Sequence, residues 1–228
     1  MSSPTNISPV NPLPPVVVAL FIVMVLIEAR FTLGSRGLLG GPEAVGWRLD
    51  ALRTYGFSGD IFDWMVENRQ FPKEHMLRFV SYLFVHGSFT QTLFSGVMLL
   101  ALGKFVGEVF AGWAVVAVFI VSGIGGALAY GAFLDVRFPL FGAFPGVYGL
   151  IGAFTYVLWL RLGQMGERQI TAFRMIGFLM GIQLLFALIA GGNSDWVADV
   201  AGFVTGFSLS IFVIPGGWSK IRAKLRHE

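Results

Sequence analysis

Long apolar segments separated by short polar connections dominate the pattern of the chain. The first apolar run covers Val16–Ile27 and resumes at Phe31, so Pro14–Leu33 is about as long as a membrane-crossing helix. Glu28 and Arg30 lie near one end of this segment, where they either reach the membrane interface or pair with other groups. Five more segments approach the roughly 20 residues that a bilayer requires. They are Phe79–Leu102, Trp113–Leu134, Pro145–Leu162, Ala172–Ala190 and Trp196–Ile214. The pattern therefore predicts an all-α, polytopic membrane protein with six transmembrane helices.

The long connection at about 34–77 has a different pattern. Within it, residues 59–69 place Ile61, Trp64 and Met65 at i, i+3 and i+4, with the acidic residues elsewhere. This spacing predicts a short amphipathic helix, and Trp64 suits a membrane interface or a contact with a partner. The same pattern fits a loop helix that packs on its own bundle, and this alternative stays open.

The two ends of the chain are polar or proline-rich. Residues 1–15 carry five prolines and no charge, so they lack the basic segment of a secretory signal peptide. We expect a short, poorly ordered tail there. Residues 219–228 form a basic C-terminal tail, and residues 16–218 form the transmembrane domain.

Composition excludes several classes of function. Hydrophobic residues make up 55% of the chain, and charged residues only 13%. The net charge of +3 is spread over separate connections, so no nucleic-acid partner is expected. Cysteine is absent, which excludes disulfides and thiol catalysis, and the three histidines lack a metal-binding spacing. We therefore expect no cofactor and no metal, and membrane lipids as partners.

Basic residues in the short connections predict the orientation. If both termini are cytoplasmic, eight basic residues lie inside, and only Arg137 lies in a short outer loop. The long first loop does not fit this orientation, because it would place seven basic residues outside. Placing that loop inside would put the basic tail outside. We therefore expect both termini in the cytoplasm, and the protein in the cytoplasmic (inner) membrane of a bacterium.

One small-residue stretch carries a resemblance. Gly142-Ala-Phe-Pro-Gly-Val-Tyr-Gly-Leu-Ile-Gly-Ala153 resembles the active-site segment of rhomboid intramembrane proteases. That segment reads Gly-Ala-Ser-Gly-Ala, followed by an aliphatic residue, an aromatic residue, Gly and Leu. When the two are aligned on Tyr148-Gly149-Leu150, the nucleophilic serine falls on Phe144 and the next glycine on Pro145. The resemblance implies a rhomboid-like six-helix bundle with an amphipathic first loop.

Other rhomboid positions follow the same trend. His86 stands where the family has a histidine, whereas Gln91 and Ser95 replace the His and Asn that help to bind the oxyanion. Asp199 replaces the histidine of the last span. The spacing of Gly103 and Glu108 matches the family. The glycines that the family uses for packing are retained, namely Gly142, Gly149, Gly152, Gly202 and Gly206.

The altered positions argue against hydrolysis. Phe144 cannot attack a carbonyl, and Pro145 has no N–H to donate. Ser95 and His86 are nine residues apart, which on one helix is about 13 Å of rise. We therefore expect this pair not to interact, and the protein not to be an enzyme.

The resemblance then implies a rhomboid pseudoprotease that binds transmembrane helices of client proteins, as derlins and inactive rhomboids do. Two alternatives remain: a permanent structural subunit of a larger membrane complex, and an active intramembrane protease with unorthodox residues. Each candidate for partner binding also has a structural interpretation, as a cavity plug (Phe144), a solvated or paired group (Asp199) or a hydrogen-bonding side chain. The candidates are Phe144, Asp199, Gln91, Ser95 and Trp64.

Overall fold

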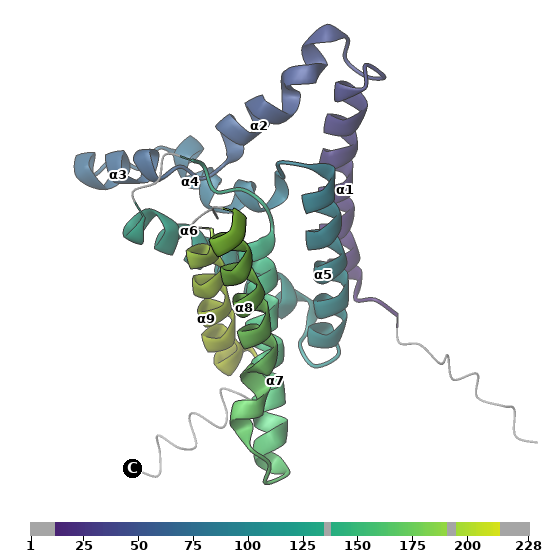
Figure 1. The fold of residues 1–228 in the computed structure, drawn as a ribbon, viewed down its shortest axis with the longest axis vertical. Helices are drawn as coiled ribbons and strands as arrows, with labels where there is room; N and C mark the ends of the chain where they lie inside the picture. The colour runs from purple at the N-terminus through teal and green to yellow at the C-terminus, as the bar shows by residue number, and fades with distance from the viewer. Residues whose placement is uncertain (1–11, 135–137, 191–194, 215–228) are drawn as a thin grey trace, which may run out of the picture.

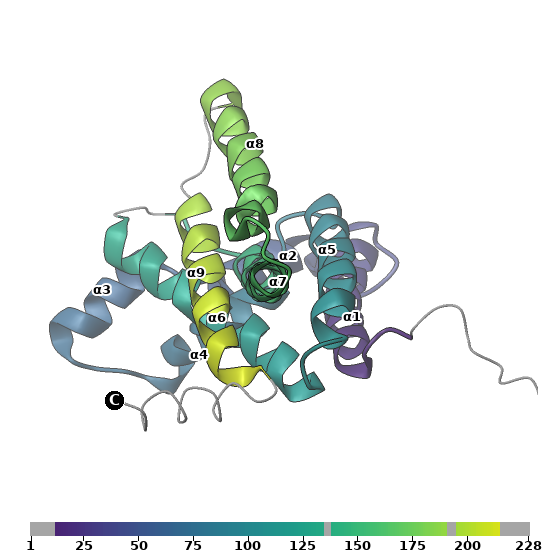
Figure 2. The same cartoon turned by 90° about the horizontal axis from the view of Figure 1, so that it is seen from below.

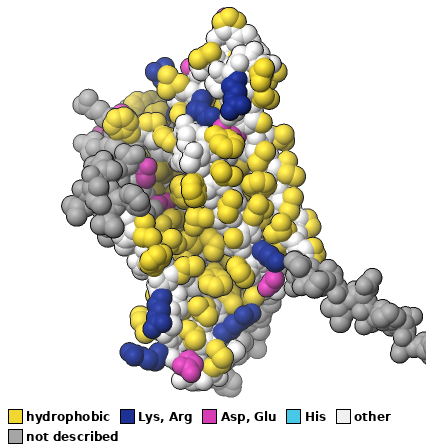
Figure 3. All heavy atoms as spheres, turned by 45° about the vertical axis from the view of Figure 1, so that its right-hand side comes forward, with side chains coloured by type: hydrophobic (Ala, Val, Ile, Leu, Met, Phe, Trp, Pro, Cys, Tyr) yellow, Lys and Arg dark blue, Asp and Glu magenta, His cyan; other side chains and the backbone are white. Residues whose placement is uncertain are grey.

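The computed structural model describes residues 12–134, 138–190 and 195–214, and these residues are helical apart from connections and one isolated β-bridge, Phe57–Leu140. Five helices are long and apolar enough to cross a membrane. They are α1 (Pro15–Ser35), α5 (Phe89–Gly107), α6 (Gly112–Phe133), α7 (Phe144–Gln164) and α9 (Trp196–Val213). Figure 3 shows apolar side chains covering the middle of the molecule, with Lys and Arg side chains towards both ends. The chain is a multi-pass integral membrane protein.

The predicted sixth span is α8, Arg174–Ala190, which follows the short helix η3 (Gln169–Phe173). With 17 residues, α8 is shorter than the five spanning helices, and the predicted count of six is not confirmed. In Figure 1, α7 and α9 run in the same direction, and α8, which lies between them in the sequence, runs in the opposite direction. Figure 2 shows that α8 leans outward from α7 and α9.

The second predicted span, Phe79–Leu102, is wrong at its start. The chain forms α4 (Lys73–Ser81) and η2 (Tyr82–Phe84), leaves the helical conformation at Val85, and begins α5 only at Phe89. Ser88 caps α5, because its Oγ accepts the Gln91 N–H at 3.2 Å. His86 therefore lies in a turn before the helix and not on it.

The long first loop is folded against the bundle. It contains η1 (Pro42–Gly46), α2 (Trp47–Tyr55) and α3 (Gly59–Asn68). The helix predicted at 59–69 is thus confirmed as α3, whereas α2 was not predicted. Met65 is buried, and Phe62 lies where a Cβ on Gly131 of α6 would stand, so α3 packs on α6.

Glycines set the closest helix crossings. A Cβ on Gly202 would collide with the carbonyl of Pro145, and one on Gly206 would collide with the backbone of Gly149. A Cβ on Gly152 would likewise meet the backbone of Phe203. These contacts bring α7 and α9 backbone to backbone, as small residues allow in membrane bundles.

Candidate functional site

A polar cluster lies where the turn at 85–88 meets the start of α5 and the segment before α7. Gly142, in that segment, donates its N–H to the Tyr82 carbonyl at 2.9 Å and has a φ of +102°. A Cβ at Gly142 would lie 2.6 Å from Gln91 Nε2 and 3.6 Å from His86 Cδ2. Both the backbone angle and this close approach require glycine here.

The central contact of this polar cluster joins His86 and Ser95. Ser95 Oγ lies 3.0 Å from His86 Nε2, and both side chains are buried. The expectation that these residues are too far apart was wrong, because it placed both on one helix. The turn before α5 instead folds His86 back over the first turns of that helix.

The protonation of His86 follows from its surroundings. Burial lowers the pKa of His86 to about 4, although the Glu28 charge and the Phe84 carbonyl oppose the shift. The imidazole is therefore neutral at pH 7. Its Nε2 accepts the N–H of Ala143 at 3.3 Å, so the ring proton belongs on Nδ1. Ser95 Oγ also lies 2.8 Å from the Gln91 carbonyl oxygen.

Gln91 is likewise engaged within the protein. Its Oε1 accepts the Gly87 N–H at 2.9 Å, and its Nε2 donates to the Phe141 carbonyl at 3.4 Å. Gln91 and Ser95 thus hold the turn at 85–88 and the segment at 141–143 together.

Phe144 and Asp199, which the resemblance aligns with the nucleophile and base of rhomboid proteases, lie at the starts of α7 and α9. Phe144 is half-buried and packs against the core. Pro145 occupies the second position of α7, where a backbone N–H would have no hydrogen-bond acceptor within the helix. Pro145 and Ala198 both approach Gly126 of α6, which brings the two helix starts together.

Asp199 lies in the first turn of α9 and is only 3% exposed, so the solvated interpretation of this residue is wrong. Burial and, to a lesser extent, the negative charge of Asp199 raise the pKa of Tyr82 well above its ordinary value. Tyr82 in turn donates its hydroxyl to the Gly123 carbonyl at 2.7 Å. Asp199 therefore belongs to a buried polar environment between α6, α9 and η2.

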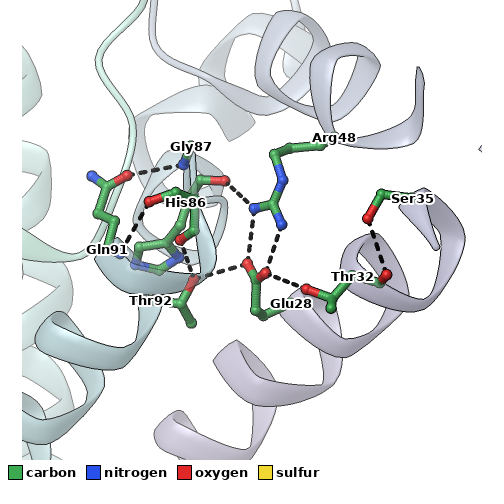
Figure 4. A network of polar contacts seen from close by, with 9 residues as sticks. Glu28, Thr32, Ser35, Arg48, His86, Gly87, Gln91 and Thr92 are labelled. Carbon is green, nitrogen blue, oxygen red and sulfur yellow. Dashed lines mark hydrogen bonds and ion pairs between the residues drawn. The ribbon is translucent and has the colours of Figure 1, made fainter. Parts of the chain in front are cut away.

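A second network, which sequence reasoning missed, adjoins the polar cluster (Figure 4). Arg48 of α2 forms a bidentate ion pair with Glu28 of α1, at 2.6 and 2.9 Å. Thr32 and Thr92 donate their hydroxyls to the same carboxylate at 2.7 and 2.9 Å. Arg48 also donates to the His86 carbonyl at 2.9 Å, which links the first loop to the polar cluster. The sequence signal was the acidic residue near the end of an apolar helix, but its partner is 20 residues away.

Trp64 is not part of this site. It lies on α3, is 41% exposed, and its ring meets the His75 ring edge-on at 6.1 Å. Within the described residues, no group of three potential metal ligands comes together.

These features define a multi-pass helical membrane protein with a buried polar cluster at the starts of α5 and α7. The family model named Rhomboid domain matches residues 73–216, which is more than half of the chain. The chain therefore belongs to the rhomboid family, which contains both serine proteases and pseudoproteases. A comparison with curated proteins gives no match.

Proposed function

We propose that this rhomboid-family protein is catalytically inactive and binds transmembrane helices of client membrane proteins without cutting them. The first support comes from the starts of α7 and α9. Phe144 has no nucleophilic atom, and Pro145 has no N–H for a developing oxyanion. Asp199 is buried, and the resemblance aligns it with the family's catalytic histidine.

The second support is that the remaining polar groups bind one another. Gln91 and Ser95 contact the turn at 85–88 and the segment before α7, and His86 Nε2 accepts the Ala143 N–H. A substrate carbonyl would have to displace these bonds before it gained any of its own. Such an arrangement holds the scaffold in shape and does not stabilise an oxyanion.

The proposal that the protein binds clients rests on the position of α8. This helix packs on η3 at its start and leans away from α7 and α9 (Figure 2). Phe178 is 68% exposed, and a Cβ on Gly177 or Gly181 would meet nothing within 4 Å. An apolar side chain flanked by two open glycines is a surface on which another transmembrane helix can approach closely.

Neighbouring helices extend this surface. Phe105 of α5 packs its ring on Phe154 of α7 at 5.8 Å, and Phe105 remains 53% exposed. Phe144, ten residues earlier on α7, is half-buried like Phe154. In this proposal a client helix enters between α5 and α8 and meets Phe144 where a substrate would meet the serine. We also propose that α8 crosses the membrane as a sixth span, with both termini in the cytoplasm.

One observation favours the unorthodox protease. Ser95 and His86 are in hydrogen-bond contact, and a neutral histidine suits a general base. Ser95 is fully buried, however, so a peptide cannot reach it without opening of the polar cluster.

Site-specific photo-cross-linking in native membranes tests client binding. A benzophenone amino acid at Phe178 should give a few discrete adducts with other membrane proteins, attached through their transmembrane segments. The matched control is Phe133 at the end of α6, which is 78% exposed and lies outside the proposed surface. Equal adduct patterns at both positions would reject client binding at α8. An adduct from Phe178 in fixed proportion that survives washing would indicate a permanent subunit instead.

A further inference from the structure

A cleft of about 500 Å³ lies between α1, α2 and η2, in the corner where α1 and α2 diverge in Figure 1. Its walls are mainly apolar: Ile27 and Phe31 from α1, Ala51 from α2, and Phe84 from η2. The volume lies within the range of small-molecule sites. The cleft borders the turn at 85–88 through Val85, but the side chains of His86, Gln91 and Ser95 do not line it.

Two opposite charges line the same cleft. Arg30 and Asp50 are both exposed, and the guanidinium of Arg30 lies 4.7 Å from the centre of the Trp47 ring. They do not form an ion pair with each other, and the ion pair nearby joins Arg48 and Glu28. The cleft therefore offers a cation and an anion beside a long apolar wall.

The walls are fixed in place before any ligand binds. Arg48, on the same helix as Asp50, is held by Glu28 of α1, and its guanidinium lies 5.3 Å from the centre of the Phe31 ring. Because the ion pair ties α2 to α1, the cleft is preformed. A preformed site loses less conformational entropy when a flexible chain enters it.

We propose that this cleft binds a zwitterionic aminophospholipid of the phosphatidylethanolamine type, with an acyl chain along Ile27, Phe31 and Phe84. Its phosphate pairs with Arg30, and its ammonium group pairs with Asp50. Val23, which also lines the cleft, is 44% exposed on the bilayer-spanning part of α1. A lipid can thus enter sideways from the membrane.

Size and charge select this occupant over others. A helix about 10 Å wide would fill 500 Å³ with little more than one turn, so a client helix does not fit. A purely anionic headgroup would satisfy Arg30 but would be repelled by Asp50. A choline headgroup carries no N–H to donate to the Asp50 carboxylate.

The test uses the full-length protein in lipid nanodiscs that contain phosphatidylethanolamine with a photoactivatable group on one acyl chain. After irradiation, labelled peptides are mapped by mass spectrometry. Labelling should concentrate on the cleft walls around Ile27 and Phe84. Thr54→Trp places an indole in the cleft and should reduce this labelling at least several-fold. The matched control is Leu49→Trp on the same helix; Leu49 is 52% exposed and does not line the cleft, so this variant should label like the parent.

Headgroup selectivity is tested by competition with unlabelled lipids. Phosphatidylethanolamine should displace the probe better than phosphatidylglycerol, by about two- to fivefold for partly exposed ion pairs. Asp50→Asn should remove this preference, and Arg30→Gln should weaken both competitors.

Three results would overturn the proposal. Even labelling of all lipid-facing helices, unchanged in Thr54→Trp, would mean that the label reports only surrounding lipid. Equal competition by the two lipids in the parent would refute the pairing of Arg30 and Asp50 with one headgroup. If Thr54→Trp abolished capture of a client protein but left lipid labelling intact, the cleft would belong to a protein partner, and the lipid assignment would be wrong.

Discussion

The ion pair between Glu28 and Arg48 allows the sharpest prediction about stability. Arg48→Met removes the guanidinium and leaves the Glu28 carboxylate, which is 4% exposed, with only the hydroxyls of Thr32 and Thr92. Removing one partner of a buried ion pair typically costs about 3–5 kcal/mol. Because the Arg48 side chain is 22% exposed, we expect the lower end, about 3 kcal/mol.

The loss should be visible in thermal unfolding. For a chain of this size, about 3 kcal/mol corresponds to a decrease in Tm of roughly 6–12 °C. The measurement is unfolding in one mild detergent, followed by intrinsic fluorescence. The matched control is the double variant Glu28→Leu/Arg48→Met, which removes both charges and should recover much of the lost stability, because no charge stays buried without its partner.

A second measurement separates the ion pair from general damage. Arg48 donates to the His86 carbonyl at 2.9 Å, so its loss should speed hydrogen exchange in the turn at 85–88 more than in α6. If Arg48→Met unfolds within about 1 °C of the parent, or if the double variant is no more stable than the single one, the buried-charge reasoning is refuted.

Three further predictions test other parts of the structure. Gly202→Leu should lower the free energy of unfolding by about 1–3 kcal/mol in the same assay, because its Cβ would collide with the Pro145 carbonyl. Unchanged stability would exclude a tight crossing of α7 and α9 at this position. Since the folded-state pKa of His86 is lowered to about 4, the unfolded state binds more protons between pH 6.5 and 4. Stability should therefore be constant above about pH 6.5 and fall by up to about 1.4 kcal/mol per pH unit below it, and His86→Gln should flatten this slope; an equally steep slope in that variant would assign it to other groups. The double variant Phe144→Ser/Asp199→His should not cleave a model transmembrane substrate, since Gln91, Ser95 and Pro145 remain; cleavage by it would show that these three losses matter little.

The apolar pattern predicted most helices and failed where a local signal interrupts an apolar run. Residues 79–102 read as one span, yet the chain leaves the helical conformation at Val85, and Ser88 caps the next helix. A serine followed by helix-forming residues is a recognisable cap signal, and it would have moved the start of α5 to Phe89. That single error also separated His86 from Ser95.

Other parts of the site were beyond the reach of sequence periodicity. The partner of Glu28 lies in α2, a helix whose weak amphipathic pattern gave no signal, and the pairing depends on how the first loop folds back on α1. The packing glycines could be predicted from the sequence, because their spacing alone places them along one side of α7 and of α9. Gly149, Gly152, Gly202 and Gly206 accordingly lie where helices cross most closely.

We propose that the protein holds client helices and leaves them intact. The most direct measurement places a client captured through Phe178 in liposomes with the purified protein and follows the client's intact mass over time. We expect a full-length client at every time point, for the parent and for Ser95→Ala alike. A client cut within its transmembrane segment by the parent but not by Ser95→Ala would contradict the account and identify Ser95 and His86 as a working catalytic pair.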